Sequence, residues 1–157
     1  MAEKVLNTIA NCVNPRVHSS YIRLLCNGWM TGRRFQGQKR CSFQCGAEED
    51  SIEHFATCRV VISCYRKFLD LHPPELGLEL DHLLCMDLNC DYRTHSGGDE
   101  DLFSRICRRR VLGCYALYML HNKIRHGLVD PDDYQDAFGR FVRNGELGMD
   151  QRRSLSE

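Results

Sequence analysis

The chain lacks a hydrophobic run long enough to span a bilayer, and its first residues lack the pattern of a secretory signal. It begins MAEKVLNTIANCVNP, with no basic segment followed by a long apolar one. A membrane-spanning helix needs about 20 consecutive apolar residues. We therefore expect an intracellular protein, nuclear or cytoplasmic, whose cysteines are reduced thiols or metal ligands.

The chain also lacks net charge, because 21 Lys and Arg balance 21 Asp and Glu. That balance alone argues against an electrostatic attraction of the whole protein to nucleic acid or anionic membrane. The charges, however, lie in blocks. Seven basic residues and no acid occur over 4–46, the net charge is −8 over 70–101, and six basic residues and no acid occur over 105–125. Nucleic-acid binding by one block therefore stays open.

Signatures of common enzymes are absent as well. The sequence has no G-x-x-x-x-G-K-[ST] phosphate loop, no G-x-G-x-x-G and no G-x-S-x-G nucleophile elbow. It has no aspartate pair in the strand-turn context of a two-metal polymerase. His121 and His126 are five residues apart and would not share a helical face well. We therefore predict a protein that is not an enzyme.

The length and composition predict one ordinary globular domain. The chain has 157 residues, of which 43% are hydrophobic and 27% charged. Apolar spacing predicts a mainly α fold, with five or six helices and a short hairpin or loop that carries a cysteine pair. We expect a single domain over residues 1–145, followed by a polar tail over 146–157.

Capping residues and glycines predict where the helices begin and end. Asp50 and Glu53 form a capping box before one helix, and Gly127 follows the longest one. Asp130 and Pro131 suit the start of the last helix. The expected helices span residues 3–13, 15 to about 28, 51–71, 78–88, 101–126 and 131 to about 145, with loops over 31–40 and 91–100.

Cysteine is the abundant residue, with 10 in the chain, and four residues have the spacing of metal ligands. Cys41, Cys45, His54 and Cys58 form the pattern C-x3-C-x8-H-x3-C. His54 and Cys58 are four apart on the expected helix 51–71 and so share a face. Gly46 allows a tight bend after the second cysteine. Three thiolates and one imidazole complete a closed tetrahedral shell for Zn²⁺, which is typical of a structural site.

Other interpretations of these cysteines stay open. Cys41 and Cys45 can be free loop thiols, with His54 and Cys58 as core residues of the helix. Cys64 can act as a substitute ligand on the same helix. A second and weaker set with chelating potential comprises His82, Cys85, Cys90 and His95.

A basic segment directly precedes the first cysteines. It contains four cations that can contact phosphate, namely Arg33, Arg34, Lys39 and Arg40. The rings of Trp29, Phe35 and Phe43 can stack on unpaired bases, although we favour a role in anchoring the segment to the core. Residues 108–110, three arginines in a row, are expected on a solvated helix face.

The residues around the cysteines resemble a known family. NGWMTGRRF at 27–35, Cys41 and Cys45, DSIEHF at 50–55 and Cys58 are similar to the zinc-binding region C-terminal to the reverse transcriptase of non-LTR (LINE-type) retrotransposons. The similarity covers residues 20–70 well, and YALY at 115–118 looks like the helix that follows in such elements. It implies a fragment of a polyprotein or a domesticated copy, in which the zinc region holds RNA or target DNA near the polymerase.

These patterns together predict a zinc-stabilised accessory domain that binds RNA or DNA. The polymerase part of the same polyprotein is a further expected partner. One alternative is a zinc-stapled helical module for protein–protein interaction, using the acidic segment 70–101 or the long helix after it. Another is a degenerate reading frame with no selected function.

Overall fold

The computed structural model describes the chain in several stretches, and most of the residues in them are helical. The described residues are 6–7, 9–11, 13–26, 28–29, 31–32, 40–69 and 100–153. They contain no strand, which confirms the predicted mainly α class. The cysteine pair is carried by a loop rather than a hairpin. The predicted helix 78–88 and residues 91–99 of the predicted loop 91–100 lie outside the described residues, and residue 100 is helical.

The helix α2 (Pro15–Leu25) begins at Pro15, as the sequence predicts. Pro15 occupies the first turn, and the Asn14 side chain accepts the backbone N–H of Val17 at 3.1 Å. The helix buries Val17, Tyr21 and Leu24. Residues 6–7 and 9–11 before it are also helical, in agreement with the helix predicted over 3–13.

The single helix predicted over 51–71 is wrong, because the chain forms two. They are α3 (Ile52–Thr57) and α4 (Arg59–Leu69), and Cys58 between them has an extended ψ of 120°. The predicted capping box is wrong too. The side chain of Ser51, and not that of Asp50, caps α3 by accepting the His54 N–H at 3.0 Å. The helix therefore starts one residue later than expected.

The two longest helices form an antiparallel pair. They are α7 (Glu100–Arg125) and α8 (Tyr134–Arg153), joined by a turn and the short 3-10 helix η2 (Pro131–Asp133). Gly127 has a φ of +64°, as expected of the residue after a helix. The predicted end of the last helix near residue 145 is wrong: α8 continues because Gly145 is buried against α7, where a Cβ would meet Leu112.

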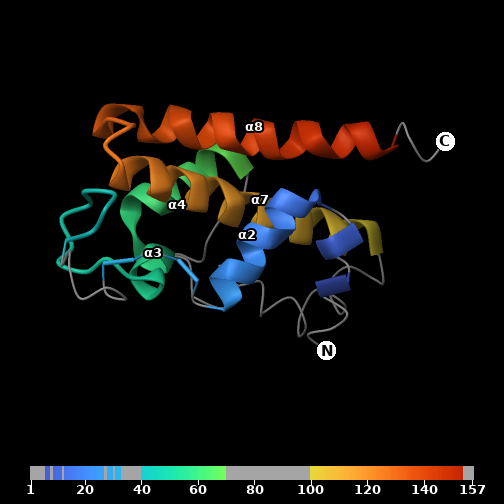
Figure 1. The fold of residues 1–157 in the computed structure, drawn as a ribbon, viewed down its shortest axis with the longest axis horizontal. Coiled ribbons are helices and arrows are strands. Elements are labelled where there is room, and N and C mark those ends of the chain that lie inside the picture. Colours follow the sequence, from blue (N-terminus) through green and yellow to red (C-terminus); the bar gives the residue numbers. More distant parts are fainter. Residues whose placement is uncertain are drawn as a thin grey trace.

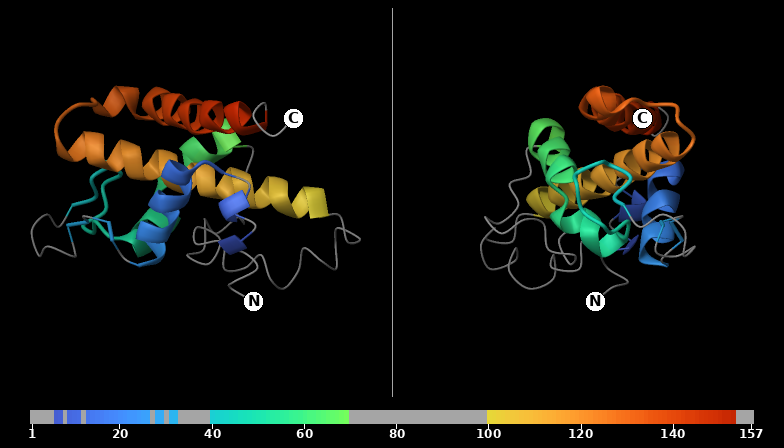
Figure 2. Two further views of the ribbon diagram at one scale, coloured as in Figure 1. Left: turned by 45° about the vertical axis from the view of Figure 1, so that its right-hand side comes forward. Right: turned by 90° about the vertical axis from the view of Figure 1, so that its left-hand side faces the viewer.

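α7 runs through the middle of the molecule, with α8 along one side and α2 across the other (Figures 1 and 2). α4 packs against both α7 and α8, and α3 leads into it. The centre of α7 is buried on all sides, including Val111, Cys114 and Leu117. The loop 40–50 and α3 lie at one end of this bundle, and the predicted metal ligands therefore lie at that end too.

Candidate metal centre

The four predicted metal ligands meet in space. One potential ligand atom from each of Cys41, Cys45, His54 and Cys58 lies within 4.8 Å of the other three. Cys41 and Cys58 are buried, and the other two are partly buried. Sequence spacing alone predicted this set, and the structure shows a group that can hold a metal ion.

Tight turns in the loop 40–50 bring Cys41 and Cys45 together. The Gln44 N–H donates to the Cys41 carbonyl at 2.9 Å, and Gln44 takes a φ of +54°. Gly46 follows with a φ of +96°, the left-handed conformation that glycine adopts without strain. The Ala47 N–H then points at the Cys45 sulfur, 3.5 Å away. The predicted bend at Gly46 is therefore confirmed.

Cys58 reaches the cluster through the helix break rather than through the shared helical face that we expected. Its N–H closes the end of α3 on the Phe55 carbonyl, and its own carbonyl accepts the Ile62 N–H at the start of α4. The thiol thus lies at a helix N-terminus, where backbone N–H groups stabilise a thiolate.

The distances within the cluster are close to those around a tetrahedral zinc ion. Sγ of Cys41 and Sγ of Cys58 are 3.9 Å apart, and Sγ of Cys45 and Nε2 of His54 are 3.2 Å apart. Zn–S bonds of about 2.3 Å and Zn–N bonds of about 2.0 Å give edges of about 3.8 and 3.5 Å in a tetrahedron. Since no two of the four ligand atoms are more than 4.8 Å apart, each pair needs to approach by at most about 1 Å for all of them to reach one ion.

The hydrogen-bonded thiols of Cys41 and Cys58 shift each other's pKa in opposite directions. The hydrogen bond from Cys41, and after it the N–H groups of Val61 and Val60, lower the pKa of Cys58 to about 5 against the effect of burial. The same hydrogen bond and burial raise the pKa of Cys41. A bound cation would favour the thiolate form of both.

The remaining predicted ligands do not join this group. Cys64 is buried on α4 outside the cluster, and burial raises its pKa to about 12, which favours the neutral thiol. His82, Cys85, Cys90 and His95 lie outside the described residues. None of the seven described cysteines is in a disulfide, as expected.

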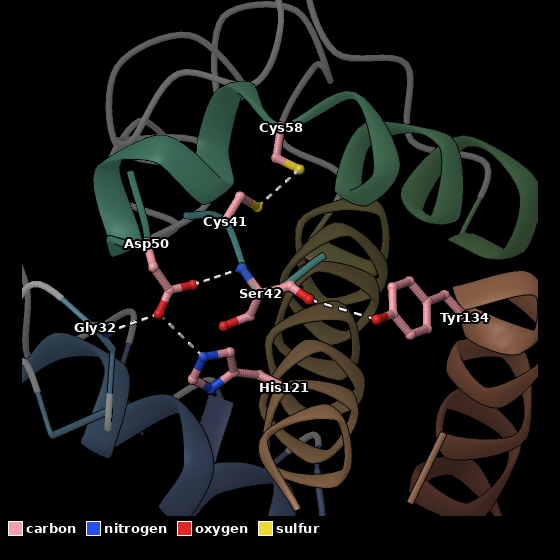
Figure 3. Close-up of polar contacts among 7 residues, drawn as sticks. All are labelled: Gly32, Cys41, Ser42, Asp50, Cys58, His121 and Tyr134. Atoms are coloured by element: carbon pink, nitrogen blue, oxygen red, sulfur yellow. Dashed lines mark hydrogen bonds and ion pairs between the residues drawn. The ribbon is translucent and has the colours of Figure 1, made fainter. Parts of the chain in front are cut away.

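A buried polar network that the sequence did not reveal lies beside the cluster (Figure 3). The Asp50 carboxylate, only 2% exposed, accepts the Gly32 N–H at 2.6 Å and the Ser42 N–H at 2.9 Å. Nε2 of His121, on α7, lies 3.7 Å from Oδ2 of Asp50, the same oxygen that accepts the Gly32 N–H. Burial opposes the charge on Asp50, but His121 and the two backbone donors outweigh it and lower the pKa of this carboxyl.

Aromatic rings enclose His121 in this network. Trp29 stacks on the imidazole with ring centres 6.3 Å apart, and Phe43 and Phe55 lie at 6.1 and 5.4 Å. Trp29 is buried, which agrees with the preferred prediction that it anchors the segment to the core, whereas Phe35 lies outside the described residues. Phe43 is buried as well.

The structure places only one of the four predicted phosphate-binding cations. Arg40 is exposed next to Cys41, whereas Arg33, Arg34 and Lys39 lie outside the described residues. The expectation of a solvated face at 108–110 is partly wrong, because Arg110 is buried at 7% exposure, Arg108 is half-buried and only Arg109 of the three is exposed.

Comparisons with known proteins leave the chain without an assigned family. No family model, curated protein or solved structure matches it. Within the described residues, no helix is both long enough and apolar enough to cross a membrane.

Proposed function

We propose that this chain is a zinc-stabilised, non-catalytic domain that binds RNA or DNA through the basic segment next to its metal loop. The observation that carries the proposal is the convergence of Cys41, Cys45, His54 and Cys58 on one point. Their resemblance to the zinc region of non-LTR retrotransposon proteins suggests an accessory role beside a reverse transcriptase.

Zinc is the metal that this donor set suits best. Thiolate and imidazole ligands in a tetrahedral arrangement are typical of structural Zn²⁺ sites, whereas Ca²⁺ and Mg²⁺ require oxygen ligands. Four protein ligands leave no open position for a substrate or an activated water. The proposed role of the ion is therefore to link the loop 40–50 to α3 and to the break between α3 and α4.

Charge and position support a nucleic-acid partner. The seven basic residues over 4–46, with no acid among them, lead directly into the metal loop. Arg40 is exposed beside Cys41. A metal-stapled loop would hold such cations at fixed positions, which lowers the entropy lost when they bind phosphates. The proposed contacts are ionic, made by Arg33, Arg34, Lys39 and Arg40, because Trp29 and Phe43 are buried.

The salt dependence of binding tests this partner. We would measure the affinity of the zinc-loaded chain for short single-stranded RNA and DNA oligonucleotides at increasing salt. Each lost phosphate contact reduces the log–log slope by about 0.7, so changing the four cations to Gln should reduce it by about 3.

A matched variant controls for the loss of charge. It changes four exposed arginines on α4 and α8 to Gln, namely Arg59, Arg66, Arg140 and Arg143. We expect this variant to keep most of the wild-type slope. Absence of binding by the wild type at low salt, or an equal loss in both variants, would contradict the proposal. The protein-interaction alternative would then be favoured, with the acidic segment 70–101 as its surface, since the centre of α7 is already buried.

A further inference from the structure

The peptide groups around Ser42, inside the first cysteine pair, are held by Asp50 at the end of the same loop and by Tyr134 on α8 (Figure 3). The Ser42 N–H donates to Oδ1 of Asp50 at 2.9 Å. The Ser42 carbonyl accepts a hydrogen bond from the Tyr134 hydroxyl, on α8, at 3.4 Å. Cys41 directly precedes Ser42, so these contacts fix the backbone that carries a ligand.

Asp50 is in turn fixed from the opposite side. Its second oxygen accepts the Gly32 N–H at 2.6 Å and lies 3.7 Å from Nε2 of His121. Both Asp50 and the His121 side chain are almost completely buried, at 2% and 0% exposure. A charged carboxylate is retained in a protein interior only where polar partners surround it, and those of Asp50 come from Gly32, from the metal loop and from His121 on α7.

We propose that Asp50 and Tyr134 are positioning residues of the metal centre, which hold the Cys41–Cys45 turn in the conformation that binds the ion. This inference rests on the proposed metal function. Groups that orient the ligands of a metal typically change its affinity by about 10- to 100-fold when they are replaced. The α7–α8 pair would thereby set the affinity of a site to which it contributes no ligand.

A carboxylate is required at position 50 for a geometric reason. Its two oxygens accept from two different backbone segments, one at Gly32 and one at Ser42. An asparagine offers one acceptor oxygen, and its amide nitrogen would face a second donor. Asp50→Asn therefore keeps the shape of the side chain but breaks one of the two contacts.

Titration with Co²⁺, whose visible absorption bands report the geometry of a thiolate site, tests the proposal on the full chain. We expect Asp50→Asn to lower the Co²⁺ affinity by about 10-fold or more and to shift the bands. Tyr134→Phe removes only the long hydroxyl contact and should lower the affinity by roughly threefold.

Two variants control for charge and for stability. Asp136→Asn removes an exposed carboxylate of α8 that pairs with Lys67, and Val142→Ala weakens the core of α8. Both should keep the wild-type absorption bands, because neither residue touches the metal loop. If Asp50 only stabilised the fold, Asp50→Asn would lower the stability, as Val142→Ala does, and keep the wild-type bands.

Wild-type bands and affinity in both Asp50→Asn and Tyr134→Phe would overturn the proposal. If Asp50→Asn does not fold, Tyr134→Phe decides alone, and an unchanged affinity and spectrum in that variant would overturn it. If the wild-type chain binds no Co²⁺, the proposed metal function itself is wrong. If the wild type and both variants bind Co²⁺ equally, only the positioning role of Asp50 and Tyr134 is wrong.

Discussion

At the scale of single residues, Asp50 shows what a local sequence pattern does not reveal. Followed by Ser51 and, three positions on, by Glu53, it fits a capping box, and the sequence predicts it there. Ser51 performs the capping instead, and Asp50 turns inward to Gly32, Ser42 and His121. The partners are 18, 8 and 71 residues away, so no spacing rule connects them.

The ionisation of Asp50 predicts an acid-dependent loss of stability. A carboxyl whose pKa is lowered by folding stabilises the native state above its unfolded pKa of about 4, and this contribution is lost as the pH falls towards the folded pKa. Asp50→Asn lacks it. In metal-free protein, the difference in unfolding free energy between wild type and variant should be constant above about pH 5 and shrink below about pH 4. Urea unfolding at several pH values measures it, and a difference that keeps its full size down to about pH 2.5 would count against the assigned contacts.

The four metal ligands themselves were predicted from the sequence, although one part of the reasoning was wrong. Their spacing is local, and Gly46 takes the left-handed turn that the sequence predicts. The shared helical face of His54 and Cys58 does not exist, because α3 ends before Cys58. The break depends on Cys58 facing Cys41 and on α4 turning toward α7 and α8, which are tertiary constraints.

At the scale of elements, α4 packs closely on α7 at a glycine. A Cβ on Gly113 would lie 2.7 Å from the Tyr65 ring and from Leu69. Such a distance is possible only if the two helices separate or the ring moves. Helix periodicity predicted α7 well, since its ends follow local signals such as Gly127. It did not predict where α8 ends, because burial of Gly145 against Leu112 extends that helix.

Gly113→Ala is therefore expected to destabilise the fold despite the higher helix propensity of alanine. Overpacking typically costs about 1–3 kcal/mol, which exceeds the gain of about 1 kcal/mol from replacing glycine within a helix. Chemical denaturation measures the change. Gly127→Asn serves as the control, because asparagine tolerates the positive φ of that position and a Cβ there meets no other atom within 4 Å. Equal or higher stability of Gly113→Ala would contradict the close packing.

At the scale of the whole molecule, two kinds of contact join the loop 40–50 to the helices. Buried groups join it through Asp50, His121 and Tyr134, and the proposed ion joins it through His54 and Cys58. The net charge of zero has no bearing on the partner, because the basic block lies over one end of the sequence and the acidic block over 70–101. The predicted domain limit at residue 145 stays a prediction, whereas the helix itself continues to Arg153.

Zinc content, measured together with thermal stability, shows whether a bound metal ion stabilises this fold. Chain purified in reducing, zinc-containing buffer should retain one Zn²⁺ per molecule, and a chelator should lower its unfolding temperature. Cys58→Ser should lose the ion, whereas Cys64→Ala, a buried cysteine outside the cluster, should keep it. A wild-type chain that retains no zinc and unfolds at the same temperature with and without chelator would contradict the account.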